Sequence, residues 1–356
     1  MSHPSESVDF VALSLLPISS WRHAAAFLRA GEPPHHILER VIRERPLVPR
    51  VDLPALRSRA VAALARAKDR HIVLVRWSDA SYPAALSAIV DPPPVLWVRG
   101  NLAALSKPAV AVVGSRAGSP YALTVAERLS GELAERGVVV VSGLARGVDS
   151  AAHRGALAAN GSTLAVLGSG TDVIYPVEHK GLARAIETDG AVLSELLPGT
   201  PPQKRFFPLR NRIISGLSRA VLIVEAGEKS GSLITARCAL DQGREVLAVP
   251  GNVLSGRNRG GHGLLRDGAK IVESADDILE ELGVTARGGR PRREGLGGGP
   301  APEDPVLQSL PAGEPCDLDA ICERTGMRSA RLLPRLFELE MQGLVRRAGG
   351  GRFVRV

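Results

Sequence analysis

Six short runs of β-branched and aliphatic residues constrain the fold of this chain more than any other feature. They alternate with helical stretches between residues 69 and 284, at residues 109–113, 138–141, 163–167, 191–193, 220–224 and 245–248. Apolar runs of this length between helices are typical of strands buried on both faces of a sheet. The fold class that this pattern predicts is α/β, with a doubly wound parallel sheet.

The stretch after the first run has the spacing of a helix that packs on such a sheet. Ala122, Val125, Leu129 and Leu133 recur three or four residues apart, and Gly137 follows where the helix would end. In a doubly wound sheet, ligands bind at the carboxyl ends of the strands. The unusual glycine and polar residues fall at those ends, in residues 114–116, 142–147, 168–170, 194–195 and 225–232.

Three further segments flank this region. Residues 1–68 are predicted to form a small all-α domain, because their helical spacing is broken into short pieces by glycine and proline. Residues 285–304 are rich in Gly, Pro and Arg, which is typical of a flexible basic linker. Residues 305–356 have the pattern of three helices and a β-hairpin, and this predicts a winged-helix domain.

The third helix of the predicted winged helix, at residues 329–342, leaves two functions open. Arg328, Arg331 and Arg335 suit a helix that binds duplex DNA. Glu338 and Glu340 in the same segment suit a protein-binding or dimer-packing surface instead.

Charge and cysteine usage limit the partners and the compartment. The chain has 45 Lys and Arg against 37 Asp and Glu, and its net charge of +8 favours an anionic partner, most simply nucleic acid. Cys238, Cys316 and Cys322 form no CxxC pair, so we expect reduced thiols and neither a disulfide framework nor a zinc site. Because the sequence has no secretory leader and no apolar run of about 18 residues, we expect a cytoplasmic protein outside the membrane.

The segment 206–217 concentrates residue types that are scarce elsewhere. Phe206 and Phe207 are adjacent in a chain with 6 Phe, 3 Tyr and 3 Trp. Four cations surround them, namely Lys204, Arg205, Arg210 and Arg212. Cations that hold phosphates beside a ring on which a base stacks are typical of single-stranded nucleic-acid binding. The alternative is that the rings fill the core while the arginines form a solvated face.

Two loops at strand ends suit a phosphate. In Gly114-Ser115-Arg116, a hydroxyl and a guanidinium follow a strand near the start of a helix. Ser230-Gly231-Ser232 leads into a helix whose free amides and hydroxyls would face an anion. Either loop alone could be only a helix cap. Two such loops around the 206–217 segment favour one anion-binding site.

The sequence supports an enzyme site less well. It contains neither a dinucleotide fingerprint nor a Walker A motif, so we expect no nucleotide cofactor. Asp149 and His153 could be an acid and base pair on one helix, or Asp149 could cap its helix while His153 hydrogen-bonds locally. Glu195 and Glu225 follow two strands, where paired carboxylates could act in hydrolysis.

The order and spacing of these motifs over about residues 70–280 closely resemble the DNA-processing protein A (DprA/Smf) family. The motifs that carry the resemblance are residues 112–116, 142–149 with His153, Tyr175-Pro176, Ser194-Glu195, 207–218, 230–237 and 248–251. The resemblance implies an extended Rossmann-like domain that binds single-stranded DNA, forms homodimers and loads the recombinase RecA onto incoming DNA in natural transformation. It implies no catalysis. The N-terminal helices resemble the family's sterile-alpha-motif or helix-hairpin-helix-like module.

The resemblance also implies a set of binding residues. The positions that match the family's DNA-binding pocket are Ser115, Arg116, Gly143, Lys204, Phe207, Asn211, Ser230, Gly231 and Ser232. With the neighbouring cations Arg205, Arg210 and Arg212, they make up the DNA-binding site that we expect.

Two other functions stay open at this point. Nucleoside-monophosphate phosphoribohydrolases are of the same Rossmann-like lineage, although residues 225–232 stand where their Pro-Gly-Gly-x-Gly-Thr loop would be. A transcription regulator would bind duplex DNA through residues 305–356.

Overall fold

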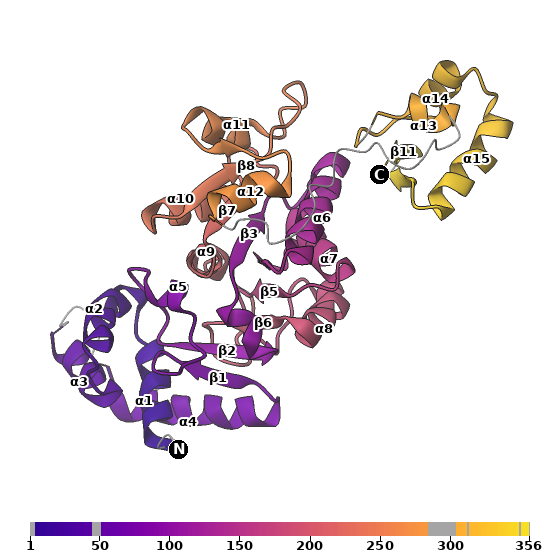
Figure 1. Ribbon diagram of the computed structural model, residues 1–356. Coiled ribbons are helices and arrows are strands. Elements are labelled where there is room, and N and C mark those ends of the chain that lie inside the picture. Colours follow the sequence, from indigo (N-terminus) through magenta and orange to yellow (C-terminus); the bar gives the residue numbers. More distant parts are fainter. Residues whose placement is uncertain (1–3, 45–50, 284–303, 312, 349, 356) are drawn as a thin grey trace.

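The computed structural model describes residues 4–44, 51–283, 304–311, 313–348 and 350–355 (Figure 1). Residues 285–303 of the predicted linker lie outside the described residues. Asp304, predicted as the last linker residue, instead caps the first C-terminal helix, since its carboxylate accepts a hydrogen bond from the Val306 N–H at 2.8 Å.

A nine-stranded sheet forms the centre of the molecule, in the order β1-β2-β6-β5-β4-β3-β7-β8-β9. Its strands are β1 Val73–Arg76, β2 Val95–Gly100, β3 Ala109–Val113, β4 Val139–Ser142, β5 Thr163–Val166, β6 Ala191–Ser194, β7 Ala220–Ile223, β8 Glu245–Ala248 and β9 Lys270–Ile271. Strands β3 to β9 pair in parallel, whereas β1 and β2 extend the sheet in antiparallel. The predicted doubly wound α/β fold is confirmed.

All six predicted strands are present, with ends that shift by at most one residue. The prediction missed three strands. The two residues of β9 are too few to give a pattern, and β1 and β2 lie before the first predicted run. The apolar run of β2 directly follows Pro92-Pro93-Pro94, which is the composition of a loop.

Helices cover both faces of the sheet, and alternate residues of β3 contact different helices. Ala109, Ala111 and Val113 pack in one core with α9 Phe206–Gly216 and α10 Ser232–Asp241. Val110 and Val112 pack on the other face with α6 Pro120–Glu135, α7 Val148–Ala158 and α12 Ala275–Glu281. The other α-helices described around the sheet are α5 Ala84–Ser87, α8 Lys180–Asp189 and α11 Arg259–Arg266.

The predicted packing face of α6 is correct except at one position. Ala122, Leu129 and Leu133 are fully buried, but Ala126 is buried where Val125 was expected, and Val125 is half-buried. Gly137 ends this segment with a φ of 76°, a conformation that favours glycine.

Four N-terminal helices pack beside the antiparallel edge of the sheet. They are α1 Pro4–Ser14, α2 Ile18–Arg29, α3 Pro34–Glu44 and α4 Leu53–Asp69. Their core includes Val95 and Trp97 of β2. The helices therefore share apolar contacts with the sheet on which they lie.

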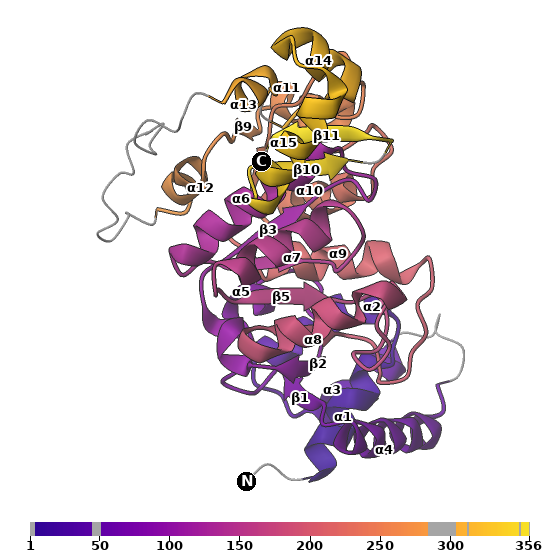
Figure 2. The same ribbon diagram turned by 90° about the vertical axis from the view of Figure 1, so that its right-hand side faces the viewer.

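The C-terminal residues form a winged helix, as predicted. Its elements are α13 Pro305–Ser309, α14 Leu318–Thr325, α15 Ser329–Met341, β10 Val345–Ala348 and β11 Arg352–Arg355. The β10–β11 hairpin lies near α6 (Figure 2), where Arg346 forms an ion pair of 3.6 Å with Glu127 and donates a hydrogen bond to the Thr124 hydroxyl.

Candidate functional site

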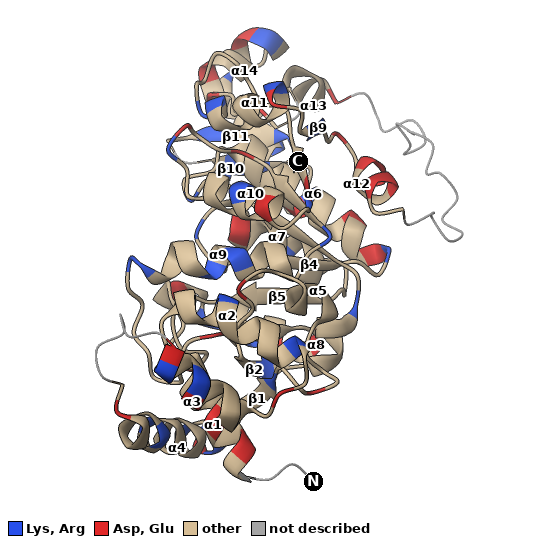
Figure 3. Cartoon of the chain, turned by 90° about the vertical axis from the view of Figure 1, so that its left-hand side faces the viewer, with Lys and Arg blue, Asp and Glu red and all other residues tan. Residues whose placement is uncertain are grey.

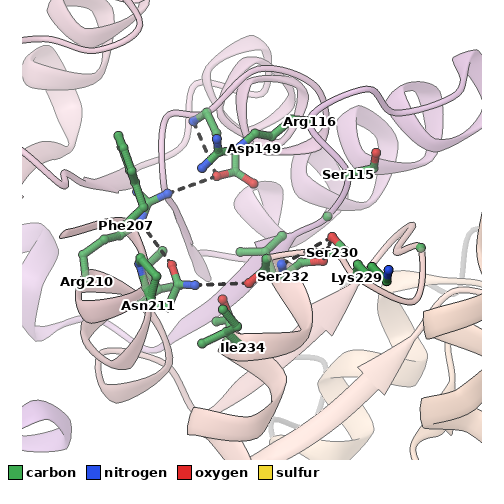
Figure 4. Close-up of a pocket in the computed structure, with 18 of the residues that line it drawn as sticks. Ser115, Arg116, Asp149, Phe207, Arg210, Asn211, Lys229, Ser230, Ser232 and Ile234 are labelled. Carbon is green, nitrogen blue, oxygen red and sulfur yellow. Dashed lines mark hydrogen bonds and ion pairs between the residues drawn. The ribbon is translucent and has the colours of Figure 1, made fainter. Parts of the chain in front are cut away.

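Most of the predicted site residues meet at a hollow of about 810 Å³ where β3, β4 and β7 end (Figure 4). The chain order reverses between β3 and β7, and ligands of doubly wound folds bind at such a switch point. The predicted residues that line the hollow are Ser115, Arg116, Lys204, Phe207, Arg210, Asn211, Ser230, Gly231 and Ser232. Gly143, Arg205 and Arg212 are not among its lining residues.

Three exposed cations surround this hollow. Arg116, Lys204 and Lys229 form no ion pair with any residue that the structure describes. Lys229 was not among the predicted site residues, although its position next to Ser230 was a usable signal. On the side of the molecule drawn in Figure 3, acidic and basic residues are mixed. The unpaired cations therefore mark the site more clearly than the net charge does.

The ring of Phe207 lies at the wall of the hollow and is half-buried. The Arg116 guanidinium carbon is 5.3 Å from the ring centroid, and the Tyr175 ring centroid is 5.7 Å away. A Cβ at Gly168 would come within 2.9 Å of the Phe207 ring, so glycine is needed there. Phe207 is therefore a partly open ring with a cation and a second ring beside it.

Tyr175 is a further residue of the hollow that was not predicted as a site residue. It is 42% exposed, and the Tyr175-Pro176 bond is cis. The Tyr-Pro pair was visible in the sequence, but its proximity to Phe207 depends on the fold.

The two predicted phosphate loops offer hydroxyls, and some of the backbone amides in and beside them are already bonded. The Ser115 hydroxyl accepts a hydrogen bond from the Ala117 N–H, and α6 begins only at Pro120. The hydroxyls of Ser230 and Ser232 lie 2.7 Å apart at the start of α10. The N–H groups of Leu233 and Ile234 donate to loop carbonyls, which corrects the expectation that free amides of this helix would face the anion.

Asn211 connects α9 to the Ser230 loop. Its amide nitrogen donates to the Gly231 carbonyl at 3.2 Å, and its side-chain oxygen accepts from the Arg210 Nε, also at 3.2 Å. Because Phe207 and Asn211 are four residues apart on one helix, both reach the same hollow.

Arg210 borders the hollow but points into the protein. Its guanidinium donates to the carbonyls of Gly143 and Val166 and lies 3.8 Å from the Asp149 carboxylate. A Cβ at Gly143 would overlap the guanidinium, so Gly143 makes room for Arg210 rather than lining the hollow. Burial lowers the pKa of Arg210 to about 10, which leaves it charged at neutral pH. The prediction that Arg210 grips a phosphate is corrected by this placement.

Arg212 and Arg205 also differ from the prediction. Arg212 is buried, forms an ion pair with Glu195, and lies 3.6 Å from Asp91 and 5.3 Å from the Trp21 ring centroid. It therefore faces the N-terminal helices. Arg205 is exposed but lies over the Phe206 ring, outside the hollow.

Asp149 and His153 are structural in this arrangement. Asp149 accepts hydrogen bonds from the N–H groups of Gly143 and Ala145, so it organises the preceding loop and does not cap α7. His153 Nδ1 is 2.7 Å from the Thr163 hydroxyl, which itself donates to a backbone carbonyl. Burial lowers the pKa of His153 to about 3. A neutral, fully buried imidazole is a poor candidate for a general base.

The carboxylates of Glu195 and Glu225 have different partners. Glu195 pairs with Arg212, and burial raises its pKa. Glu225 accepts hydrogen bonds from the Ser119 N–H and hydroxyl at the start of α6. Neither lines the hollow that holds Phe207.

Among the residues described, no group of three or more His, Cys, Asp or Glu side chains is placed to hold a metal ion. The three cysteines are free. In the same part of the chain, no helix combines the length and apolar character needed to cross a membrane.

Two family models match the chain. The model described as DNA recombination-mediator protein A matches residues 73–283, and the DprA winged helix domain matches residues 292–351. Protein Smf of Escherichia coli K12 is 42% identical over 276 residues, which span 76% of this chain and 74% of the relative. DNA processing protein DprA of Streptococcus pneumoniae is 49% identical over 204 residues, which span 57% of this chain and 72% of the relative.

Solved structures are similar as well. The X-ray structure of DprA from Streptococcus pneumoniae has a TM-score of 0.67 at 37% identity and covers 79% of this chain and 99% of its own. A structure of DprA from Helicobacter pylori, titled for its single-stranded DNA-binding mode, has a TM-score of 0.54 at 31% identity and covers 60% of this chain and 96% of its own.

Proposed function

The chain belongs to the DNA recombination-mediator protein A (DprA/Smf) family, and on this premise we propose that it binds single-stranded DNA in the hollow where β3, β4 and β7 end. The observation that carries the proposal is the set of unpaired cations, Arg116, Lys204 and Lys229, around the open ring of Phe207. Phosphates of the strand would contact the cations, and a base would stack on the ring. The Helicobacter pylori relative, whose title names single-stranded DNA binding, supports the same ligand.

A single strand suits this site better than a duplex. The ring lies at the wall of a hollow, and a paired base would have to leave its stack to reach it, which costs a few kcal/mol. Ring stacking and phosphate contacts carry no base-edge information. We therefore expect binding that depends little on sequence.

The test compares a labelled oligonucleotide of mixed sequence with the duplex of the same length, by fluorescence anisotropy at several salt concentrations. We expect the single strand to bind about tenfold more tightly or better, because the duplex must unpair a base. Two single strands of different composition should bind within a few-fold of each other. Equal or tighter binding of the duplex would overturn the proposal.

We further propose that the protein acts on DNA without catalysing a reaction. Asp149 lines the hollow, but its carboxylate accepts hydrogen bonds from the Gly143 and Ala145 N–H groups. His153, Glu195 and Glu225 have structural partners outside the hollow, so none of the four residues is a free acid or base. Incubation with nucleoside monophosphates, and separately with DNA and Mg²⁺, should yield no products. Cleavage that disappears in Glu195→Gln or Asp149→Asn would argue for an enzyme instead.

The family description names a recombination mediator, and this supports the proposal that the bound strand is passed to the recombinase RecA in the cytoplasm, as in natural transformation. Adding the protein should shorten the lag before RecA hydrolyses ATP on single-stranded DNA coated with single-strand-binding protein. An unchanged lag at saturating protein would count against RecA loading.

We also propose that residues 69–284 form a homodimer, as the family resemblance implies. A truncated chain that ends at residue 284 should have the mass of a dimer at micromolar concentration. A monomeric mass would contradict this proposal while leaving DNA binding untouched.

A further inference from the structure

The exposed side of α15 carries an apolar stripe. Leu333, Phe337 and Met341 are 43%, 54% and 75% exposed, and Leu344 just beyond the helix is 42% exposed. Their spacing of four, four and three residues places them on one side of the helix. Leu332, Leu336 and Leu339 on the opposite side form the core of the winged helix. The helix is thus apolar on two faces, of which only one is covered by its own domain.

This stripe does not suit the major groove of a duplex. A helix that reads bases presents hydrogen-bonding side chains to their edges, whereas the stripe itself consists of leucine, phenylalanine and methionine. Contiguous apolar surface bordered by charges is typical of a protein interface. Figure 1 shows α15 on the part of the winged helix that lies away from the sheet, and the side chains of the stripe are exposed there.

The charges beside the stripe change sign along the helix. Arg328 and Arg331 in the N-terminal half form no ion pair with any described residue. Glu338 and Glu340 lie in the C-terminal half, where Glu338 forms an ion pair of 2.5 Å with Arg335 and Glu340 one of 3.3 Å with Arg347. Arg331 and Glu338 lie on the same side of the stripe, because both line a hollow of about 470 Å³ beside α15. When two copies of α15 run in opposite directions, the basic half of each helix lies beside the acidic half of the other.

We propose that α15 packs against α15 of a second copy of this chain, antiparallel and about a two-fold axis. A two-fold axis brings the same patch of both copies together, with the N-terminal half of one helix beside the C-terminal half of the other. When Leu333 of each copy lies against Phe337 of the second copy, Arg331 comes beside Glu338 of that copy. Apolar burial supplies the attraction. The Glu338 carboxylate is 57% exposed beside Arg335, so it would be shared with Arg331 of the second copy, and these two symmetric contacts select the antiparallel register.

This contact is separate from the homodimer proposed for residues 69–284 and goes beyond DNA binding. A chain with two different self-contacts forms assemblies larger than a dimer, either closed or open-ended. The winged helix would then connect dimers along a bound strand.

The test uses the full chain and sedimentation velocity over a range of concentrations. Arg331→Glu and Glu338→Arg each place like charges together at two symmetric positions, and we expect either to weaken this association about tenfold. Because Glu338→Arg also removes the ion pair with Arg335, its melting temperature is compared with that of Glu338→Gln, which removes the same pair without adding a cation. The double variant restores opposite charges and should restore assembly. Failure of the double variant to recover what both single variants lose would overturn the two-fold register.

Phe337→Asp should abolish the association, and Val61→Asp on α4 is its matched control, because Val61 is 55% exposed and Phe337 54%. Circular dichroism should show unchanged melting for Arg331→Glu, an exposed substitution of a side chain that forms no ion pair with any described residue. If all variants have the mass of the unmodified chain, α15 is not a self-contact. If Arg331→Glu instead reduces duplex DNA affinity at unchanged mass, the occupant is DNA and the proposal fails.

Discussion

Basic residues have opposite environments on two sides of α9: they are exposed beside the hollow and buried on the other sides. On the side of the hollow, Phe207 and Asn211 lie near the exposed cations Arg116 and Lys204, which lack ion pairs with any described residue. On its other sides, the same helix carries Arg210 and Arg212, which are buried against carboxylates. A Lys or Arg side chain is available to bind a ligand phosphate when no carboxylate of the chain is already paired with it. The buried arginines fix the helix, and the open cations are left for the ligand.

The largest expected effect is on the buried side. Arg212→Ala leaves the Glu195 carboxylate buried without its partner, and we expect it to lower the free energy of unfolding by about 3–5 kcal/mol. Urea denaturation measures this loss. Arg237→Ala, at an exposed position of α10, is the control and should change stability by less than about 0.5 kcal/mol.

Replacing both Arg212 and Glu195 tests whether the loss in Arg212→Ala comes from the unpaired buried carboxylate. Arg212→Leu with Glu195→Leu removes the ion pair without leaving a lone buried charge, so the double variant should be more stable than Arg212→Ala. If Arg212→Ala itself proves as stable as the unmodified protein, the ion pair does not hold α9 in place.

A pH effect follows from His153, which is buried near Arg210. Its folded pKa of about 3 is below the usual 6.5, so between these values the unfolded chain binds a proton that the folded chain does not. Stability should therefore fall as pH drops below 6.5, by about 1.4 kcal/mol per pH unit. In urea titrations, the unmodified protein should lose about 2 kcal/mol more than His153→Asn between pH 6.5 and 5.

The comparison with His153→Asn isolates this group. Burial raises the pKa values of Asp149 and Glu195, so these two groups make the folded state more stable as the pH falls. This contribution is the same in the unmodified protein and in His153→Asn, so it cancels in the comparison. Parallel pH profiles for the two proteins would mean that His153 takes up its proton in the folded state.

On the side of the hollow, Phe207→Ala should weaken single-stranded DNA binding by about 1–3 kcal/mol and leave its salt dependence nearly unchanged. Phe206→Ala is the matched control, because Phe206 is also half-buried but faces Arg205 outside the hollow. Anisotropy titrations and melting temperatures decide the outcome. A melting temperature lowered by many degrees, with affinity intact in the folded fraction, would make Phe207 a core residue.

The smallest expected effect belongs to Arg116. Its removal should weaken binding to every sequence and reduce the slope of log K against log salt by about 0.7 for one lost phosphate contact. Arg205→Ala, an exposed cation outside the hollow, is the comparison and should leave the slope unchanged. An unchanged slope in Arg116→Ala would show that this guanidinium contacts no phosphate.

The fold class and the location of the candidate site could be predicted from local residue patterns. Fully apolar runs such as residues 109–113 have to be buried on both faces, so their alternation with helices indicated a doubly wound sheet. Parallel strands bring their carboxyl ends to one edge, so loops far apart in the chain, such as those at Ser115 and Ser230, could be expected to meet. Local periodicity and topology were sufficient for both conclusions.

Which cations stay open to a ligand could not be predicted in this way, because it depends on contacts between distant segments. In the sequence, Lys204, Arg210 and Arg212 are basic residues of one short segment and cannot be told apart. In the fold, Arg210 and Arg212 are buried beside the carboxylates of Asp149 and Glu195, which come from distant segments. The helical period places Arg210 and Arg212 on different sides of α9, but it does not say what covers those sides. A charge can be buried only where an opposite charge is close in space, and that proximity exists only in the folded chain.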